Sequence, residues 1–153
     1  MPLSDLLAQE AVLPSLKGGT KKQVLQELAE RAAEISGLDA RELFETLLQR
    51  ERLGSTGIGR GIAIPHGKMP KASRLFGLFA RLEKPVDFGS IDGEAVDLVF
   101  LLIAPESAGA DHLKALARVA RMLREPSTIQ ALRTTRDPSA LFAVLTQSHS
   151  HAA

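Results

Sequence analysis

The chain of 153 residues contains no cysteine, no tryptophan and no tyrosine. Without cysteine it can form neither disulfides nor thiolate metal sites, and thiol catalysis is excluded. Aromatic residues make up only 4% of the sequence, which leaves no platform for stacking nucleic-acid bases. The formal net charge of +1 argues against bulk electrostatic binding of nucleic acid or of an anionic membrane surface. We therefore expect no nucleic-acid partner.

Long hydrophobic runs are missing as well. No apolar stretch approaches the ~20 residues of a membrane span, and the N-terminus lacks the basic and apolar regions of a signal peptide. We expect a soluble cytoplasmic protein without membrane insertion. Hydrophobic residues make up 44% of the chain and charged residues 24%, which suits one domain with a substantial core. We assign that domain to residues 1–147 and a polar C-terminal tail to residues 148–153.

Two capping signals mark helices in the first third of the chain. Thr20, with Gln23 three residues later, forms a capping box for a helix that runs to about Ile35. Asp39 caps a second helix, and the charged residues 50–52 fall in its last turn. The sequence therefore predicts a pair of helices before the first long apolar run.

Strands follow in the middle of the chain and helices return after them. Residues 75–82 predict a strand, and residues 96–103 predict a longer strand buried on both faces. Further helices are expected from Asp111, over residues 126–132 and over residues 138–146. The inner stripe of the Asp111 helix is expected at Leu113, Leu116, Ala117, Ala120 and Leu123. This order predicts an α/β fold of the α+β type, in which a mixed parallel and antiparallel sheet is sandwiched between helices on both faces.

The most informative segment is residues 54–68, Gly-Ser-Thr-Gly-Ile-Gly-Arg-Gly-Ile-Ala-Ile-Pro-His-Gly-Lys. Its glycines permit positive φ angles and let backbone N–H groups approach an anion closely. Residues 62–64 predict a very short strand that Pro65 ends. His66 then follows the strand, and Gly67 adds no side-chain bulk beside it. We expect an exposed imidazole that meets or carries an anion.

Two common glycine-rich motifs fail on this segment. Residues 54–59 have the outer spacing of a phosphate-binding P-loop, but Arg60 and Gly61 stand where lysine and a hydroxyl residue are needed. A dinucleotide fingerprint requires a third glycine where the chain has Ile62, and a preceding strand where it has a helix. Neither nucleotide interpretation holds.

For several polar residues, their spacing alone leaves two interpretations open. Arg50 could complement the end of its helix, or its guanidinium could bind phosphoryl oxygens. His112 could be an ordinary first-turn residue of its helix, or a second imidazole facing the same anion. Ser55 and Thr56 could cap a turn, or one hydroxyl could hold a ring nitrogen of His66 and fix its tautomer.

A metal site has little support in the sequence. The plausible ligands are His66, Asp111 and His112, and their spacing matches no zinc motif. His149 and His151 lie in the predicted tail, and we assign them no role. We expect no metal.

Residues 50–68, from Arg50 and Glu51 through the Pro-His-Gly sequence, closely resemble the active-site region of a known family. They are similar to the IIA components of the fructose/mannitol type in the bacterial phosphoenolpyruvate-dependent phosphotransferase system. The version of residues 54–59 found here is most similar to the nitrogen-regulatory branch. The resemblance covers essentially the whole domain, including residues 85–88 and 111–117. It implies a mixed sheet with helices on both faces.

The resemblance also implies roles for particular residues. His66 matches the histidine that accepts a phosphoryl group from an HPr- or NPr-type phosphocarrier protein. His112 matches the second active-site histidine, which stabilises that group, and Arg50 matches an arginine that assists transfer. No metal or organic cofactor is implied. We add as supporting residues Ser55, Thr56, Gly57 and Gly67, and as partner-binding residues Ile58, Ile62, Lys68 and Met69.

The function favoured by this resemblance is a phosphoryl carrier whose phosphorylation state regulates other proteins, such as kinases or transporters. We expect one domain without a sugar-specific IIB or membrane IIC region, and a monomer or a weak homodimer. One alternative is a sugar-uptake IIA that passes phosphate to a fructose- or mannitol-type IIB. Another is a regulatory module that only docks, for which Arg60 is the supporting feature because other nitrogen-regulatory members often carry a small polar residue there.

Overall fold

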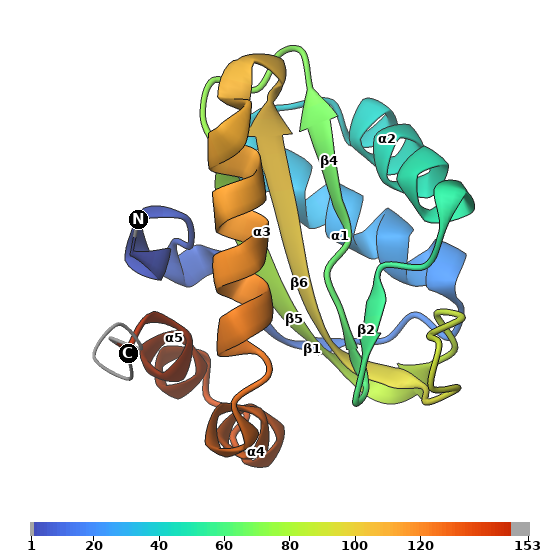
Figure 1. Cartoon of the computed structure of the whole chain (residues 1–153), viewed down its shortest axis with the longest axis vertical. Helices are drawn as coiled ribbons and strands as arrows, with labels where there is room; N and C mark the ends of the chain where they lie inside the picture. The colour runs from blue at the N-terminus through green and yellow to red at the C-terminus, as the bar shows by residue number, and fades with distance from the viewer. Residues whose placement is uncertain (1, 148–153) are drawn as a thin grey trace.

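A mixed β-sheet forms the centre of the fold in the computed structural model, which describes residues 2–147 (Figure 1). Within those residues the sheet has six strands in the order β1-β5-β6-β3-β2, and β4 also pairs with β6. The strands are β1 (Val12–Leu16), β2 (Gly57–Gly59), β3 (Ile62–Ala63), β4 (His66–Met69), β5 (Phe76–Val86) and β6 (Val96–Pro105). The expected mixture of parallel and antiparallel pairs is confirmed, since β5 is antiparallel to β6 whereas β3 and β4 are parallel to it.

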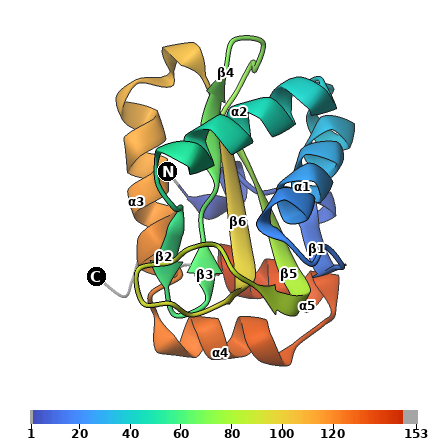
Figure 2. The same cartoon turned by 90° about the vertical axis from the view of Figure 1, so that its right-hand side faces the viewer.

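Helices cover both faces of the sheet. Figure 2 shows α3 and α1 on opposite sides of it, with α2 crossing the upper part of the side that faces the viewer. The helices are α1 (Lys21–Ser36), α2 (Ala40–Leu53), α3 (Ala110–Met122), α4 (Pro126–Thr134) and α5 (Pro138–Thr146), and three short 3-10 turns lie at Leu3–Asp5, Gln9–Ala11 and Glu106–Ala108. The predicted sandwich of a sheet between helices is therefore confirmed.

Strand β6 is the buried centre of the sheet. Every residue of β6 except Asp97 and Pro105 is buried, because β5 lies along one edge, β3 and β4 lie along the other, and helices cover both faces. This matches the near-continuous apolar run of the sequence, which is typical of a strand buried on both faces.

The two predicted helix caps form as expected. The Thr20 hydroxyl accepts a hydrogen bond from the Gln23 backbone N–H at 3.1 Å, and the Asp39 carboxylate accepts one from the Glu42 N–H at 2.9 Å. Gly37 ends α1 in the left-handed conformation with φ 79°, which favours glycine. These local signals place the start of α2 and hence the charged residues of its last turn.

The predicted inner stripe of α3 is wrong for Leu113 and Ala117, which are both exposed, Leu113 by 69%. The buried residues of α3 are instead His112, Ala115, Val119 and Met122. A shift of one residue turns a helix by about 100°, and α3 carries apolar side chains on two neighbouring stripes. Periodicity alone could not tell which stripe packs on the sheet.

Pro65 separates two strands that continue the same edge of β6. Strand β3 ends at Ala63 and β4 begins at His66, and both run parallel to β6. The Leu102 N–H donates to the Pro65 carbonyl at 2.9 Å, so the ladder continues across the proline. His66 follows a strand, as predicted, but it also begins β4, a strand that the sequence did not predict.

No helix within residues 2–147 is long and apolar enough to cross a membrane. The predicted tail at residues 148–153, including His149 and His151, lies outside the described residues.

Gly77 provides a test of packing between β5 and β6. A Cβ atom at Gly77 would lie 2.6 Å from Phe100 Cε1 and 3.3 Å from the Leu101 carbonyl oxygen. We expect Gly77→Ala to lower the free energy of unfolding by about 1–3 kcal/mol through overpacking, measured by urea denaturation. Gly19→Ala, whose Cβ would make only an ordinary contact of 3.7 Å, is the control. Equal stability of Gly77→Ala and the wild type would contradict this packing.

Candidate functional site

His66 stands at the start of β4 and is half-buried, so the imidazole that was expected to be exposed is exposed only in part. Its Nδ1 lies 2.9 Å from the Ile64 carbonyl oxygen. Because a carbonyl can only accept, Nδ1 carries the proton and Nε2 presents its lone pair. The carbonyl of Ile64 therefore fixes the tautomer of His66. Neither the Ser55 hydroxyl nor the Thr56 hydroxyl does so.

Arg50 approaches His66 from the last turn of α2. Its Nε donates to His66 Nε2 at 3.2 Å, and its Nη1 donates to the Gly54 carbonyl at 2.9 Å. The guanidinium therefore bridges the nucleophilic nitrogen and the turn that follows α2. Within residues 2–147, its other N–H groups donate to no acceptor, so the fork can serve an additional anion.

His112 approaches His66 from the first turn of α3. The two ring centroids are 5.6 Å apart with the planes at 72°. His112 is only 6% exposed, and within residues 2–147 its Nε2 has no hydrogen-bond partner. A buried polar atom without a partner is rare in native proteins. An oxygen-rich group bound between the two rings would supply the missing partner.

Both imidazoles are held neutral by their surroundings. Burial is the main cause that lowers the pKa of His66; the hydrogen bond to Ile64 opposes that shift, and the charge of Arg50 adds to it. Burial also lowers the pKa of His112, helped by repulsion from His66 whenever that ring is protonated and from the charge of Lys68. A neutral imidazole keeps its lone pair at pH 7, so the Nε2 of His66 is a competent nucleophile.

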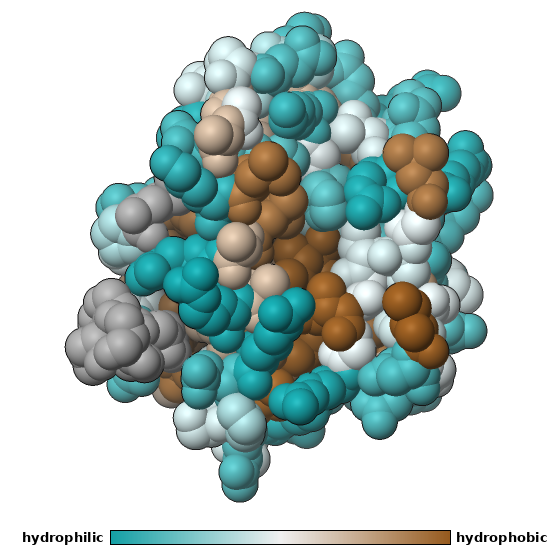
Figure 3. All heavy atoms as spheres, in the orientation of Figure 1, coloured by the Kyte–Doolittle hydropathy of each residue, from teal (hydrophilic) through white to brown (hydrophobic). Residues whose placement is uncertain are grey.

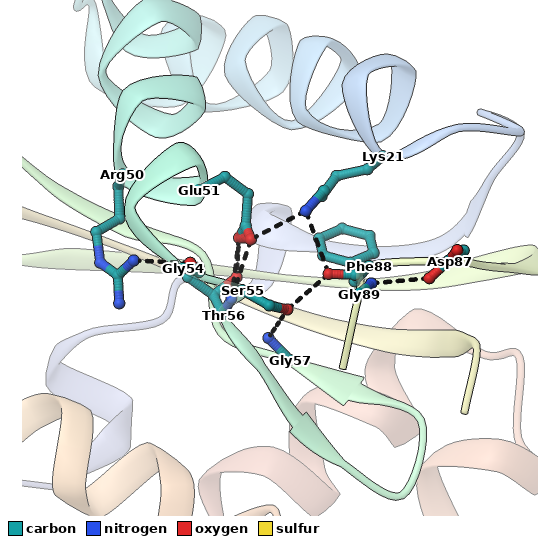
Figure 4. A network of polar contacts seen from close by, with 10 residues as sticks. All are labelled: Lys21, Arg50, Glu51, Gly54, Ser55, Thr56, Gly57, Asp87, Phe88 and Gly89. Atoms are coloured by element: carbon teal, nitrogen blue, oxygen red, sulfur yellow. Dashed lines mark hydrogen bonds and ion pairs between the residues drawn. The ribbon is translucent and has the colours of Figure 1, made fainter. Parts of the chain in front are cut away.

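A buried carboxylate organises the turn that follows α2 (Figure 4). The Glu51 side chain is 2% exposed and lies 3.5 Å from Lys21 Nζ. It accepts hydrogen bonds from the Thr56 N–H at 2.9 Å and from the Thr56 hydroxyl. The Ser55 hydroxyl donates to the Phe88 carbonyl at 2.6 Å, and the same carbonyl accepts from Lys21 at 3.2 Å. The network joins α1, α2, the glycine-rich segment and the loop after β5.

The glycine-rich segment differs from the expected anion cradle. The N–H groups of Thr56, Gly57 and Arg60 donate to Glu51, the Ser55 hydroxyl and Asp92, respectively. These donors are therefore already used within the protein. The segment is a scaffold beside His66.

The glycines of this segment have different uses. Gly59 and Gly61 have positive φ angles of 92° and 79°, and Arg60 between them has φ 59°. Gly57 does not have positive φ; a Cβ there would collide with the Ser90 hydroxyl. The sequence predicted positive φ for the glycines as a group and could not show which of them serves close packing.

Gly67 is also required by a close approach. A Cβ at Gly67 would lie 2.6 Å from Thr46 Cγ2 on α2. Its absence lets α2 pack close to β4, so that Arg50 can reach His66. The close packing of α2 is therefore the specific reason why position 67 needs a residue without side-chain bulk.

The predicted partner-binding residues fall into two groups. Ile58 is 38% exposed and Lys68 is exposed, as expected. Ile62 and Met69 are each 1% exposed, so their predicted role in partner contact is wrong. Ile62 is covered because its side chain belongs to the hydrophobic core. Met69 is covered by α2, where its Sδ lies 3.2 Å from the Thr46 hydroxyl oxygen.

Other apolar side chains are exposed near these elements and were missed. Leu53 at the end of α2 is 85% exposed and Leu113 on α3 is 69% exposed. Figure 3 shows apolar side chains gathered alongside α3 on the face with β4 and β2. The exposure of Leu53 could have been predicted from the sequence, because Leu53 follows Arg52 and lies outside the buried stripe of α2. An apolar surface of this kind suits a protein partner.

Arg60 lies apart from the imidazole pair. It lines a hollow of about 460 Å³ together with Glu94, Pro126, Ile129, Gln130 and Arg133. Arg133 in that hollow is held by Asp97 at 2.8 and 2.9 Å. Arg60, on which the docking-only alternative rests, therefore does not reach His66.

The metal interpretation lacks a third ligand in the described part of the chain. Asp111 is exposed, and residues 2–147 hold no group of three or more His, Cys, Asp or Glu side chains placed to bind a metal ion. The two imidazoles face each other without a carboxylate to complete a site.

The match to known sequences gives the class of the protein first. Residues 5–148 match the family described as "Phosphoenolpyruvate-dependent sugar phosphotransferase system, EIIA 2". The match spans nearly the whole chain, which places it in the class of phosphotransfer components of that system. Within this class, the chain belongs to the type 2 EIIA family, that of the fructose/mannitol type.

Individual relatives agree with this assignment. The nitrogen regulatory protein of Bradyrhizobium diazoefficiens is 61% identical over 145 residues, which cover 95% of each chain. The crystal structure of nitrogen regulatory protein IIA-Ntr from Neisseria meningitidis has a TM-score of 0.88 and 34% identity, covering 94% of this chain and 98% of that one. The fructose-specific EIIABC component of Bacillus subtilis is 31% identical over 148 residues, covering 96% of this chain and 23% of that protein.

The lowered pKa values predict how stability depends on pH. A histidine whose pKa is lowered by folding binds fewer protons in the folded state than in the unfolded chain. The free energy of unfolding should therefore fall as the pH drops below the unfolded-state pKa of about 6.5. Urea denaturation between pH 5 and 8 measures this, and the double variant His66→Gln/His112→Gln should show a weaker decline. Identical pH dependence in both proteins would contradict the shifts.

Proposed function

We propose that this protein is a phosphoryl carrier of the phosphotransferase system that accepts its phosphoryl group on Nε2 of His66. The observation that carries this proposal is the hydrogen bond from Nδ1 to the Ile64 carbonyl. It leaves Nε2 unprotonated, beside the guanidinium of Arg50 and close to the ring of His112, whose Nε2 has no hydrogen-bond partner within residues 2–147. The donor is an HPr- or NPr-type phosphocarrier protein, which places the function in the cytoplasm.

The transfer needs positioning and charge stabilisation more than covalent chemistry. The lone pair of His66 Nε2 attacks the phosphorus of the carrier's phosphohistidine. A new N–P bond forms at His66 as the carrier's N–P bond breaks, and the carrier's imidazole leaves. Arg50 moves its Nε–H from Nε2 to a phosphoryl oxygen, and His112 supplies a second donor. The step requires neither a metal nor an organic cofactor, and it is reversible because both ends are imidazoles.

We further propose that the phosphorylation state is the output of the protein. A phosphoryl group adds a charge of about −1.5 to −2 beside an apolar surface, which changes the affinity of that surface for target proteins such as kinases or transporters. The full-length relative that is 61% identical is a nitrogen regulatory protein, whereas the fructose-specific relative is 31% identical. This difference favours regulation over passage of phosphate to a sugar-specific IIB.

The acceptor assignment is tested by phosphorylation with phosphoenolpyruvate, enzyme I and an HPr-type carrier. We expect one acid-labile phosphoryl group by intact mass, absent in His66→Ala. His112→Ala and Arg50→Ala should still be phosphorylated, each about 100-fold more slowly, because each removes one donor to the developing charge. Phosphorylation of His66→Ala at the wild-type rate would refute the assignment.

The apolar surface is tested separately from the chemistry. Leu113→Asp and Leu53→Asp place a charge on exposed apolar positions and should raise KM for the phosphorylated carrier about 10-fold while kcat stays unchanged. Ala143→Asp, at an exposed position on α5, is the matched control and should leave KM unchanged. Unaltered KM in both leucine variants would mean that the carrier docks elsewhere.

A further inference from the structure

The turn that holds Arg50 in place has few tethers of its own. The Gly54 carbonyl, which accepts from Arg50 Nη1, belongs to an exposed residue around which a Cβ would meet nothing within 4 Å. The neighbouring Leu53 is 85% exposed. Packing therefore does not fix this turn, and its polar contacts must do so.

Glu51 supplies the buried polar contacts at both ends of the turn. Its backbone carbonyl accepts from the Gly54 N–H at 3.2 Å. Its carboxylate accepts from the N–H and the hydroxyl of Thr56. Residues 54 and 56 are thus both bound to one residue, and the Gly54 carbonyl between these contacts points at Arg50 (Figure 4).

The position of the carboxylate is in turn fixed from α1. Lys21 Nζ lies 3.5 Å from Glu51 Oε2 and donates to the Phe88 carbonyl at 3.2 Å. The Lys21 ammonium also lies 5.7 Å from the Phe88 ring centroid. A carboxylate that is 2% exposed needs such a counter-charge and hydrogen bonds to offset the loss of its hydration. The chain of contacts then runs from Lys21 through Glu51 and the turn to Arg50.

We propose that Glu51 is a positioning residue for phosphoryl transfer: its buried carboxylate holds the turn at residues 54–56 so that the Gly54 carbonyl aims Arg50 at Nε2 of His66. This inference rests on the proposed phosphoryl-carrier function. Within residues 2–147, no hydrogen bond or ion pair joins Glu51 to His66, although the charge of Glu51 acts to raise the pKa of His66. The positioning effect proposed for Glu51 passes through Arg50.

A kinetic double-mutant cycle tests this dependence. Single-turnover transfer from a radiolabelled phosphocarrier is measured for the wild type, Glu51→Gln, Arg50→Ala and the double variant. Glu51→Gln should slow transfer roughly 10- to 100-fold, as loss of a positioning contact typically does. In the Arg50→Ala background the same change should alter the rate by less than about twofold, because the side chain it positions is absent.

A matched control separates positioning from general loss of a carboxylate. Glu27 on α1 also holds a loop, accepting from the Gly18 N–H at 2.6 Å and the Lys17 N–H at 3.4 Å. Glu27→Gln should leave the transfer rate unchanged. If Glu51→Gln does not fold by circular dichroism, Thr56→Val replaces it in the cycle, since it removes the hydroxyl that Glu51 accepts from. Equal slowing by the Glu51 or Thr56 change in both Arg50 backgrounds would overturn the proposal.

A second readout does not require phosphoryl transfer. In the wild type and in Glu27→Gln, the Arg50 Nε–H donated to His66 should give a slowly exchanging signal in 15N NMR spectra. Glu51→Gln should lose this signal. If the wild type accepts no phosphoryl group, the proposed function fails, and this signal alone decides the positioning role. A signal that persists unchanged in Glu51→Gln overturns it.

Discussion

The hydrogen bond between His66 Nδ1 and the Ile64 carbonyl is the interaction on which the chemistry of the site depends. It spans Pro65, at the point where one strand along β6 ends and the next begins. Because both short strands pair with the same buried neighbour, the carbonyl and the ring are held in a fixed relation. The result is one imidazole tautomer with Nε2 turned toward Arg50. The reactive tautomer is therefore the one that the fold favours.

Three elements that are distant in sequence converge on that nitrogen. Helix α2 delivers a guanidinium from its last turn, α3 delivers His112 from its first turn, and β4 carries His66 itself. Burial keeps both imidazoles neutral, so the permanent cation at the centre of the site is Arg50. In the proposed mechanism, the site combines a neutral nucleophile with donors for a dianionic group, and exposed apolar side chains on α2 and α3 suit a protein that brings this group. The carboxylate of Glu51 links the arrangement to α1.

Much of the fold could be predicted from the sequence because its signals are local. The capping residues Thr20 and Asp39 and the continuous apolar run of β6 each determine their own element. The convergence of His66, His112 and Arg50 was predicted from resemblance, whereas their distances required the structure. The failures involve choices between equivalent local patterns. Two apolar stripes on α3 compete for the sheet. The predicted stripe was wrong for Leu113 and Ala117, whereas Leu116 and Ala120 pack against the core and Leu123 is buried. Ile62, in a predicted strand, and Met69 were expected to face a partner, but both side chains belong to the buried core. The donors of the glycine-rich segment are taken by Glu51 and Asp92, side chains that spacing does not connect to it.

The central claim is that the phosphoryl group is carried on a particular atom, Nε2 of His66. Two-dimensional 1H–15N NMR correlation spectra of the phosphorylated protein, with 15N-labelled histidine, distinguish the two ring nitrogens through their coupling to phosphorus. The account predicts a phosphorus coupling at Nε2 of His66, with Nδ1 still protonated by its bond to Ile64. A phosphoryl group on Nδ1 of His66, or on His112, would contradict it.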